Sequence, residues 1–139
     1  MSRLFPFRFN TGDFGAVYLA LERETAIAEL VKRARGANRT VASFHPRNLF
    51  VFAVHCGQVL DLTDSATREA WDITLDDLQS EDYSICQQVA AVARRNAYEA
   101  ILYPSATGHG TCLAMFYDQR HTGSHVVELS STLLDLNEL

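Results

Sequence analysis

The chain has 139 residues, the length of one domain, and its 47% apolar and 21% charged residues are typical of a globular protein, not a disordered one. The net charge of −5 argues against a protein that binds nucleic acid by itself, because such a protein needs a basic face. No apolar run approaches the roughly 20 residues that span a bilayer, and the start, MSRLFPFRFN, is too short and too polar for a secretion signal.

The first half of the chain predicts a strand, a helix and a second strand. Alternation over residues 17–21 is the period of a strand, with Tyr18 on the face opposite Val17. For the helix that follows, Thr25 is the expected N-cap and Gly36 the end, and the expected buried stripe comprises Ile27, Leu30, Val31 and Ala34. A turn-rich loop then spans residues 36–47, and the segment LFVFAVHC, residues 49–56, is apolar on both faces and predicts a buried strand.

The second half predicts two more helices and three strands. LDLTD, residues 60–64, turns the chain into a short helix through Ala66 and Trp71. A capping box formed by Ser84 and Gln87 is expected to begin an amphipathic helix that ends at Asn96, with an apolar face formed by Ile85, Val89, Val92 and Ala93. The strand candidates are residues 100–103, 112–117 and 125–129. Because strands and helices do not alternate strictly, we expect a single α+β domain over residues 1–139, not a doubly wound sheet.

Three cysteines, Cys56, Cys86 and Cys112, are present without a CxxC pair. An odd count without paired spacing argues against a disulfide framework and favours a reducing cytoplasm as the location. Cys56 ends an apolar segment, and we expect it to be an inert core residue.

Four polar side chains are candidates for a site, and each also has an ordinary structural explanation. Glu29 lies opposite the apolar stripe, so it is either an exposed glutamate paired with Arg33 at i+4 or a side chain that borders a cleft. Tyr18 has the ordinary explanation of a half-buried strand tyrosine. Arg8 has that of a surface arginine packed on aromatic rings, and Ser105 that of a turn serine.

Other signals in the sequence are weaker. Its glycines complete neither a dinucleotide-binding fingerprint nor a Walker motif. His121 and His125 have i+4 spacing, but Gly123 between them disfavours a helix, so no metal site is expected.

Several motifs, taken in order, resemble those of one known family. They are RFNTGDFGAVYLALERETAIAE, then VLDLTD, then YSICQQVAAVARRNAYEAILYPSA, then LAMF. In this order and spacing the sequence resembles the RES domain, which is named for its arginine, glutamate and serine. Members usually carry a longer segment, including a strand, before the first motif, whereas seven residues precede Arg8 here. We expect that difference to expose a sheet edge or to weaken the placement of Arg8.

The resemblance implies a fold, an activity and partners. The fold is similar to that of ADP-ribosyltransferases, with a split or mixed sheet and flanking helices. The activity is that of a bacterial toxin that degrades NAD+ at its nicotinamide–ribose bond, by phosphorolysis or hydrolysis, with NAD+ as substrate and phosphate as co-substrate. The partner is an Xre-like helix-turn-helix antitoxin, which forms a hetero-oligomer with the toxin. A homodimer of the toxin is a second arrangement that the resemblance allows. The antitoxin would supply the DNA contact that this acidic chain lacks.

The family's arginine, tyrosine, glutamate and serine match Arg8, Tyr18, Glu29 and Ser105. An arginine fork suits the pyrophosphate of NAD+, and a tyrosine face suits the cationic nicotinamide ring. A fixed carboxylate at Glu29 stabilises the positive charge that develops on the ribose, and Ser105 orients that carboxylate or the ribose.

Two alternatives share these residues. One is an ADP-ribosyltransferase that modifies a protein or a small molecule, because the glycosidic step is the same. The other is a non-catalytic module that binds NAD+ or a partner. A DNA-binding module fits poorly, because the charge is negative and no recognition-helix pattern is present.

Overall fold

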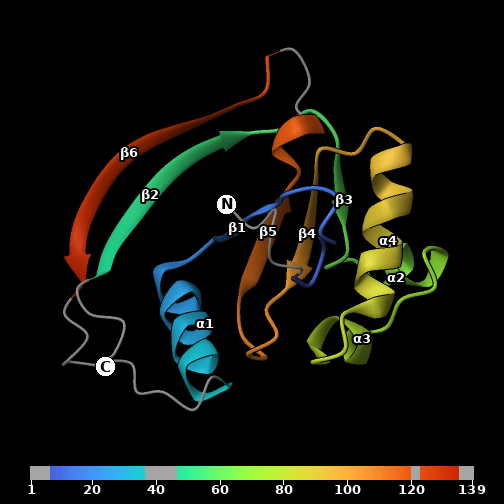
Figure 1. Ribbon diagram of the computed structural model, residues 1–139, viewed down its shortest axis with the longest axis horizontal. Helices are drawn as coiled ribbons and strands as arrows, with labels where there is room; N and C mark the ends of the chain where they lie inside the picture. The colour runs from blue at the N-terminus through green and yellow to red at the C-terminus, as the bar shows by residue number, and fades with distance from the viewer. Residues whose placement is uncertain (1–6, 37–46, 120–122, 135–139) are drawn as a thin grey trace.

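Two β-sheets organise the computed structural model, which describes residues 7–36, 47–119 and 123–134 (Figure 1). Within these ranges, a four-stranded sheet has the order β1–β5–β4–β3, with β1 at Val17–Ala20, β3 at Val59–Asp61, β4 at Ala100–Pro104 and β5 at Thr111–Met115. β1, β5 and β4 are antiparallel neighbours, and β3 pairs with β4 in parallel. The second sheet is the β2–β6 ribbon, in which Arg47–His55 pairs antiparallel with His125–Leu134. This mixture confirms the expected α+β class.

The helices divide between the two sides of the molecule (Figure 1). α1 (Arg23–Gly36) follows β1 and lies beside the ribbon, whereas α2 (Ser65–Ala70), α3 (Leu75–Gln79) and α4 (Ser84–Arg95) lie together on the opposite side. A short 3-10 helix, η2, spans Tyr117–Gln119. Within the described ranges, no helix is long and apolar enough to cross a membrane.

Alternation along the central strands places apolar side chains on both faces of the larger sheet. One face, with Ile101 and Ala114, packs against the buried side of α4, which includes Val89 and Ala90. The other face carries Ala100, Leu113 and Met115, and the base of the ribbon packs there through Val54 and Val126. The four-stranded sheet is therefore the middle layer, between α4 and the base of the ribbon.

A buried glutamate joins the ribbon to the larger sheet. Glu99 is fully buried just before β4, and its carboxylate accepts hydrogen bonds from the backbone N–H groups of Gly57 and Gln58. Its own N–H donates to the Gln58 carbonyl at 2.9 Å. Because Gly57 and Gln58 connect β2 to β3, this residue fixes where the ribbon leaves the core.

Every predicted strand and helix in the described residues is present, but α3 was not predicted and several details were wrong. The β2 segment is a strand that is largely exposed, with Phe50 48% and Phe52 38% accessible, because β6 is the one strand of the described ranges that pairs with it. β5 ends at Met115, short of the predicted Tyr117, and β6 extends to Leu134, beyond the predicted Leu129. The predicted loop lies largely outside the described residues, over 37–46.

Both predicted helix N-caps were wrong, whereas the predicted end of α1 at Gly36 is confirmed. α1 begins at Arg23, so Thr25 is inside the helix, where it is 4% exposed. α4 has Tyr83 as its N-cap, with no side-chain cap hydrogen bond. Ser84 instead donates its hydroxyl to Asp82, and the Gln87 amide donates to two carbonyls near the start of the chain. The predicted end of α4 at Asn96 is confirmed.

The apolar faces of the two helices differ from the predicted ones as well. In α1, Ala34 is buried, whereas Ile27 and Leu30 line a cleft. In α4, Val89 and Ala93 are buried as predicted, but Ile85 and Val92 are exposed, and Cys86 and Ala90 are buried instead. The face of α4 that meets the core is therefore rotated from the predicted one, whereas in α1 Ala34 alone of the predicted stripe is buried.

Candidate functional site

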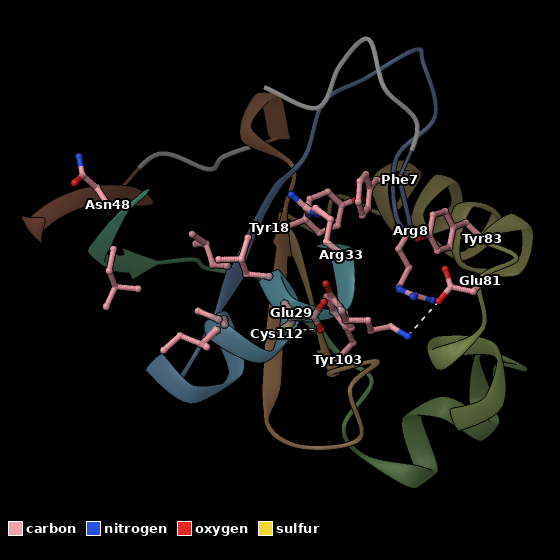
Figure 2. A pocket seen from close by; sticks show the side chains of 17 residues that line it. Phe7, Arg8, Tyr18, Glu29, Arg33, Asn48, Glu81, Tyr83, Tyr103 and Cys112 are labelled. Atoms are coloured by element: carbon pink, nitrogen blue, oxygen red, sulfur yellow. Dashed lines mark hydrogen bonds and ion pairs between the residues drawn. The ribbon is translucent and has the colours of Figure 1, made fainter. Parts of the chain in front are cut away.

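A cleft of about 600 Å³ lies between α1, β1 and the segment that leads into α4 (Figure 2). Arg8, Tyr18 and Glu29 all line it. Ser105 lies directly behind Glu29 and contacts its carboxylate. The structure therefore brings together the four predicted site residues, although the chemical role of each stays a prediction.

Ser105 holds the Glu29 carboxylate at the wall of the cleft. The serine Oγ donates to Glu29 Oε1 at 2.6 Å, and the serine is fully buried. Thr107 contacts the same Ser105 hydroxyl at 2.8 Å, and its backbone N–H donates to it at 3.2 Å. Among the described residues no donor contacts Glu29 Oε2, so this oxygen is available to a ligand. The alternative pairing of Glu29 with Arg33 is wrong, because Arg33 lies over the Phe7 ring at 5.0 Å.

The turn that carries Ser105 is packed closely against α1. The Ser105 N–H donates to the Gly110 carbonyl at 3.0 Å, which closes the turn. Gly110 has φ +83°, and a Cβ on this residue would overlap the Thr25 hydroxyl. Thr25 was predicted as a cap, and its role is instead to form the surface on which the turn rests. Glycine at 110 allows the turn and the helix to approach closely enough for Ser105 to meet Glu29.

Arg8 is held by a small loop at the start of the described chain. Phe7 and Asn10 exchange two backbone hydrogen bonds around it. The arginine is only 7% exposed, so the explanation as a surface arginine is wrong. Its Nη1 donates to the Ser80 carbonyl at 2.8 Å, and its guanidinium lies 4.7 Å from the centre of the Tyr83 ring. The Cys86 thiol also interacts with this guanidinium. A guanidinium has five N–H donors, more than these two contacts require, so it is able to bind an anion in the cleft as well.

Tyr18 connects the same loop to β1. Its hydroxyl donates to Asn10 Oδ1 at 2.7 Å and accepts from the Phe9 N–H at 2.9 Å. Burial raises the pKa of Tyr18 well above its ordinary value, so the hydroxyl remains protonated and serves as a donor. Its ring lies 5.5 Å from that of Phe7. The half-buried strand tyrosine of the ordinary explanation is confirmed, and it lines the cleft as well.

Cys112 and Cys56 differ in burial. Cys112 lies 3.8 Å from Glu29 Oε1, and burial, together with that carboxylate, raises the pKa of its thiol to about 11. Cys112 is therefore a neutral wall of the cleft. Cys56 is partly buried and packs against the core beside Met115, with the two sulfur atoms 3.9 Å apart, so its predicted core position is confirmed in part. Its pKa is raised by partial burial and by the neighbouring Glu99.

No group of three or more metal-ligating side chains capable of holding an ion lies within the described ranges. His121, part of the weak i+4 signal, lies outside those ranges.

Comparison with known proteins decides the family. The model of the RES domain family matches residues 1–137. The chain belongs to the RES domain family.

Relatives of this RES domain have names that concern NAD+. The NAD(+) phosphorylase MbcT of Mycobacterium tuberculosis is 32% identical over 109 residues, which cover 77% of this chain and 58% of that protein. The probable NAD(+) phosphorylase Rv3189 of the same species is 35% identical over 113 residues, which cover 80% of this chain and 53% of that protein. The chain thus spans a little over half the length of these curated relatives.

A crystal structure of the M. tuberculosis MbcT–MbcA toxin–antitoxin complex contains a similar fold. The TM-score is 0.87 at 29% identity, over 99% of this chain and 76% of that chain. This similarity confirms the ADP-ribosyltransferase-like α+β fold that the resemblance of the RES domain implied.

Several residues that line the cleft, or that support the residues around it, were not predicted from the sequence. Tyr83 supports the Arg8 guanidinium, Thr107 supports Ser105, and Lys32 lies one helical turn after Glu29. The i+3 spacing of Glu29 and Lys32 was a usable signal, because it places both side chains on one side of α1. Tyr83 and Thr107 had no such signal, since their roles depend on tertiary contacts.

Proposed function

We propose that this RES domain cleaves NAD+ at the bond between nicotinamide and ribose, with inorganic phosphate as acceptor. The observation that supports it best is the Glu29 carboxylate, fixed by Ser105 at 2.6 Å in a cleft that Arg8 and Tyr18 also line. Relatives with 32% and 35% identity are named NAD(+) phosphorylases, which favours phosphate over other acceptors. The proposed location is the cytoplasm, where NAD+ and phosphate are both present.

Glu29 is the residue to which we assign charge stabilisation. When the glycosidic bond breaks, its electron pair moves to the pyridinium nitrogen and positive charge develops on the ribose. A carboxylate that is already in position stabilises this charge without reorganising at the moment of reaction. Ser105 donates to Oε1, which leaves Oε2 to face the ribose. Nicotinamide leaves as a neutral molecule, so this step requires no general acid.

Arg8 and Tyr18 are assigned to binding. The Arg8 guanidinium, anchored by the Ser80 carbonyl, suits a pyrophosphate because it is always charged and presents several donors. Tyr18 offers an aromatic surface to the cationic ring, a contact worth about 0.5–2 kcal/mol. Its hydroxyl is already bonded to Asn10, which keeps the ring in place before the ligand arrives.

The experiment that tests the function measures nicotinamide release from NAD+ by purified protein, with and without phosphate. Glu29→Gln keeps the shape of the side chain and removes its charge, so we expect turnover to fall by about a hundredfold or more. Glu24→Gln is the matched control, because Glu24 is an exposed glutamate in the first turn of the same helix and does not line the cleft.

The products decide between acceptors. ADP-ribose 1″-phosphate supports the proposal, free ADP-ribose indicates hydrolysis, and label fixed on protein indicates a transferase. Binding of NAD+ without nicotinamide release indicates a non-catalytic module. Equal turnover in the wild type and the Glu29→Gln variant would remove Glu29 from the mechanism.

We also propose that the protein acts as the toxin of a pair with an Xre-like antitoxin. The support is the crystal structure of a similar chain in a toxin–antitoxin complex. Induced expression of the chain alone should deplete cellular NAD+ and arrest growth. Coexpression with its Xre-like antitoxin should restore both, and the two proteins should elute together. Normal NAD+ levels during strong expression of the wild type contradict this proposal.

A further inference from the structure

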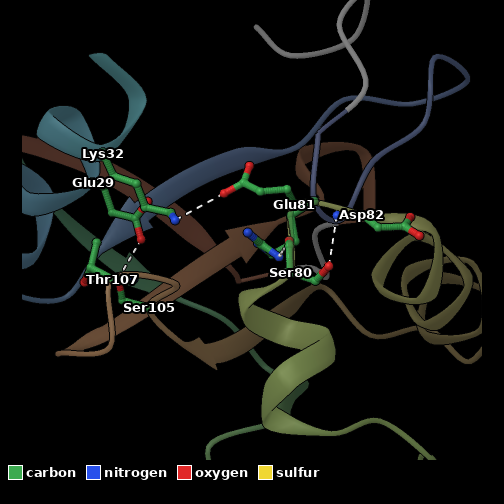
Figure 3. Close-up of polar contacts among 8 residues, drawn as sticks. Glu29, Lys32, Ser80, Glu81, Asp82, Ser105 and Thr107 are labelled. Carbon is green, nitrogen blue, oxygen red and sulfur yellow. Dashed lines mark hydrogen bonds and ion pairs between the residues drawn. The ribbon is translucent and has the colours of Figure 1, made fainter. Parts of the chain in front are cut away.

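Lys32 is the only lysine in the 139-residue sequence, and it lies in the cleft. It is on α1, one helical turn after Glu29, and both residues line the cleft. The Glu29 side chain points toward Ser105, whereas the Lys32 side chain extends toward Glu81 (Figure 3). A single compact cation beside the carboxylate that we assign to catalysis requires an explanation.

The resting partner of Lys32 is Glu81, from the segment between α3 and α4. The Lys32 ammonium lies 3.2 Å from Glu81 Oε1, so the ion pair crosses the mouth of the cleft (Figure 3). The Lys32 side chain is 39% exposed and that of Glu81 77% exposed. Exposed pairs of this kind are weak and are screened by salt. An anion of higher charge can therefore displace Glu81 from the ammonium.

The charge balance of the proposed reaction calls for such a cation. The acceptor phosphate has to reach the anomeric carbon close to the Glu29 carboxylate, and two anions at short range repel each other. Arg8 already donates to the Ser80 carbonyl and lies over the Tyr83 ring. Lys32 has three donors on a flexible stem, which suits a small anion that has to enter and be replaced at every turnover.

We propose that Lys32 binds the acceptor phosphate and that Glu81 is the counter-ion released when phosphate enters. The inference rests on the proposed function and assigns its second substrate to a place in the same cleft. In the transfer step, an oxygen of HPO₄²⁻ forms a bond to the anomeric carbon as the bond to nicotinamide breaks. The leaving electron pair neutralises the pyridinium, and the combined charge of −3 is the same on both sides without a proton transfer.

The test is a steady-state analysis in which NAD+ and phosphate are varied separately at constant ionic strength. Lys32→Gln should raise the KM for phosphate by roughly tenfold or more, because a charge-assisted hydrogen bond is lost. Glu81→Gln should change it in the opposite direction, lowering the KM for phosphate by about two- to fivefold, because a competing anion is removed. Lys32→Arg should restore much of the phosphate affinity. Arg35→Gln removes a positive charge from an exposed site in the last turn of α1 that does not line the cleft, and serves as the control.

The two variants at the ion pair separate this role from others. If Lys32→Gln raises the KM for NAD+ instead, Lys32 binds the pyrophosphate, and the proposal is overturned. If both substitutions lower kcat without changing the KM for phosphate, the ion pair is structural, and the proposal is again overturned.

A direct measurement distinguishes failure of this inference from failure of the proposed function. Inorganic phosphate is titrated calorimetrically into the wild type and into Lys32→Gln, which requires no turnover. Weaker phosphate binding in the variant supports the role of Lys32 even if the wild type releases no nicotinamide, which would refute the proposed function alone. Equal phosphate binding in both proteins refutes the role of Lys32 whether or not NAD+ is consumed.

Discussion

Replacing Gly110 with alanine tests whether the Ser105 turn has to touch α1. At φ +83°, a side chain costs about 1–2 kcal/mol of backbone strain. In addition, the new Cβ would overlap the Thr25 hydroxyl and lie 3.0 Å from both Thr25 Cβ and Cγ2. Thr25 is buried and β-branched, so it has few other rotamers, and crowding of this kind costs about 1–3 kcal/mol more.

Gly108→Ala is the matched control. Gly108 has φ +91° in the same turn, but a Cβ there meets no atom within 4 Å. It therefore carries the backbone strain without the contact. Thermal unfolding should show Gly110→Ala less stable than Gly108→Ala by about 1–3 kcal/mol, which corresponds to roughly 4 °C for each kcal/mol.

The same pair of variants links stability to the site. The Gly110 carbonyl accepts the Ser105 N–H, so a turn pushed away from α1 carries Ser105 away from Glu29. Nicotinamide release should fall by roughly tenfold to a hundredfold more in Gly110→Ala than in Gly108→Ala. Equal melting temperatures and equal turnover in the two variants would refute the reasoning that the contact with Thr25 positions Ser105.

Two further predictions concern groups around the Glu29 carboxylate. Ser105→Ala removes the hydrogen-bond donor to Glu29 Oε1, so kcat/KM should fall by about tenfold or more. Thr107→Val keeps that donor and should lose much less kcat/KM. Similar losses in both variants would show that activity depends on the turn itself and not on the Ser105 hydrogen bond. The thiol pKa of Cys112 is raised from 9.0 to about 11, so the folded protein keeps a proton that the unfolded chain releases. This contribution to stability is complete below pH 9 and is lost as the pH rises toward 11, so the urea midpoint should fall over that window less in Cys112→Ala than in the wild type; identical pH dependence in both proteins would contradict the assignment.

Periodicity in the sequence predicted most of the strands and helices, but not what covers them. The β2 segment illustrates the difference, because its apolar residues predicted a buried strand. In the structure, Phe50 and Phe52 stack on each other with ring centres 6.2 Å apart and remain accessible. Apolar residues on both faces of a strand indicate what that strand is able to bury, whereas its actual burial depends on which neighbours pair with it.

Local cap signals failed for a related reason. Ser84 and Gln87 have the spacing of a capping box, yet Asp82 takes the Ser84 N–H and hydroxyl. The Gln87 side-chain amide instead donates a hydrogen bond to the Phe7 carbonyl, 80 residues away in the chain. A polar side chain near a helix start satisfies whichever backbone group the tertiary fold brings closest, and spacing alone does not identify that group.

More of the candidate site than of its surroundings could be predicted from the sequence. Arg8, Tyr18 and Glu29 lie within 22 residues and could be linked to one another through the family motif. The Lys32–Glu81 pair and the packing of Tyr83 under Arg8 join segments that are distant in the chain. Contacts of this kind depend on where the fold places α1 and the α3–α4 segment on the two sides of the cleft, and the separate sequences of those segments contain little information about that placement.

The hydrogen bond between Glu29 and Ser105 spans 76 positions of the chain. A ribosome therefore completes the first helix long before it adds the serine that fixes the carboxylate. During most of translation, the nascent polypeptide therefore lacks the Glu29–Ser105 pair. On the function proposed for this protein, a cell making it is exposed to NAD+ loss only once the emerging chain has passed residue 105 and the turn has docked.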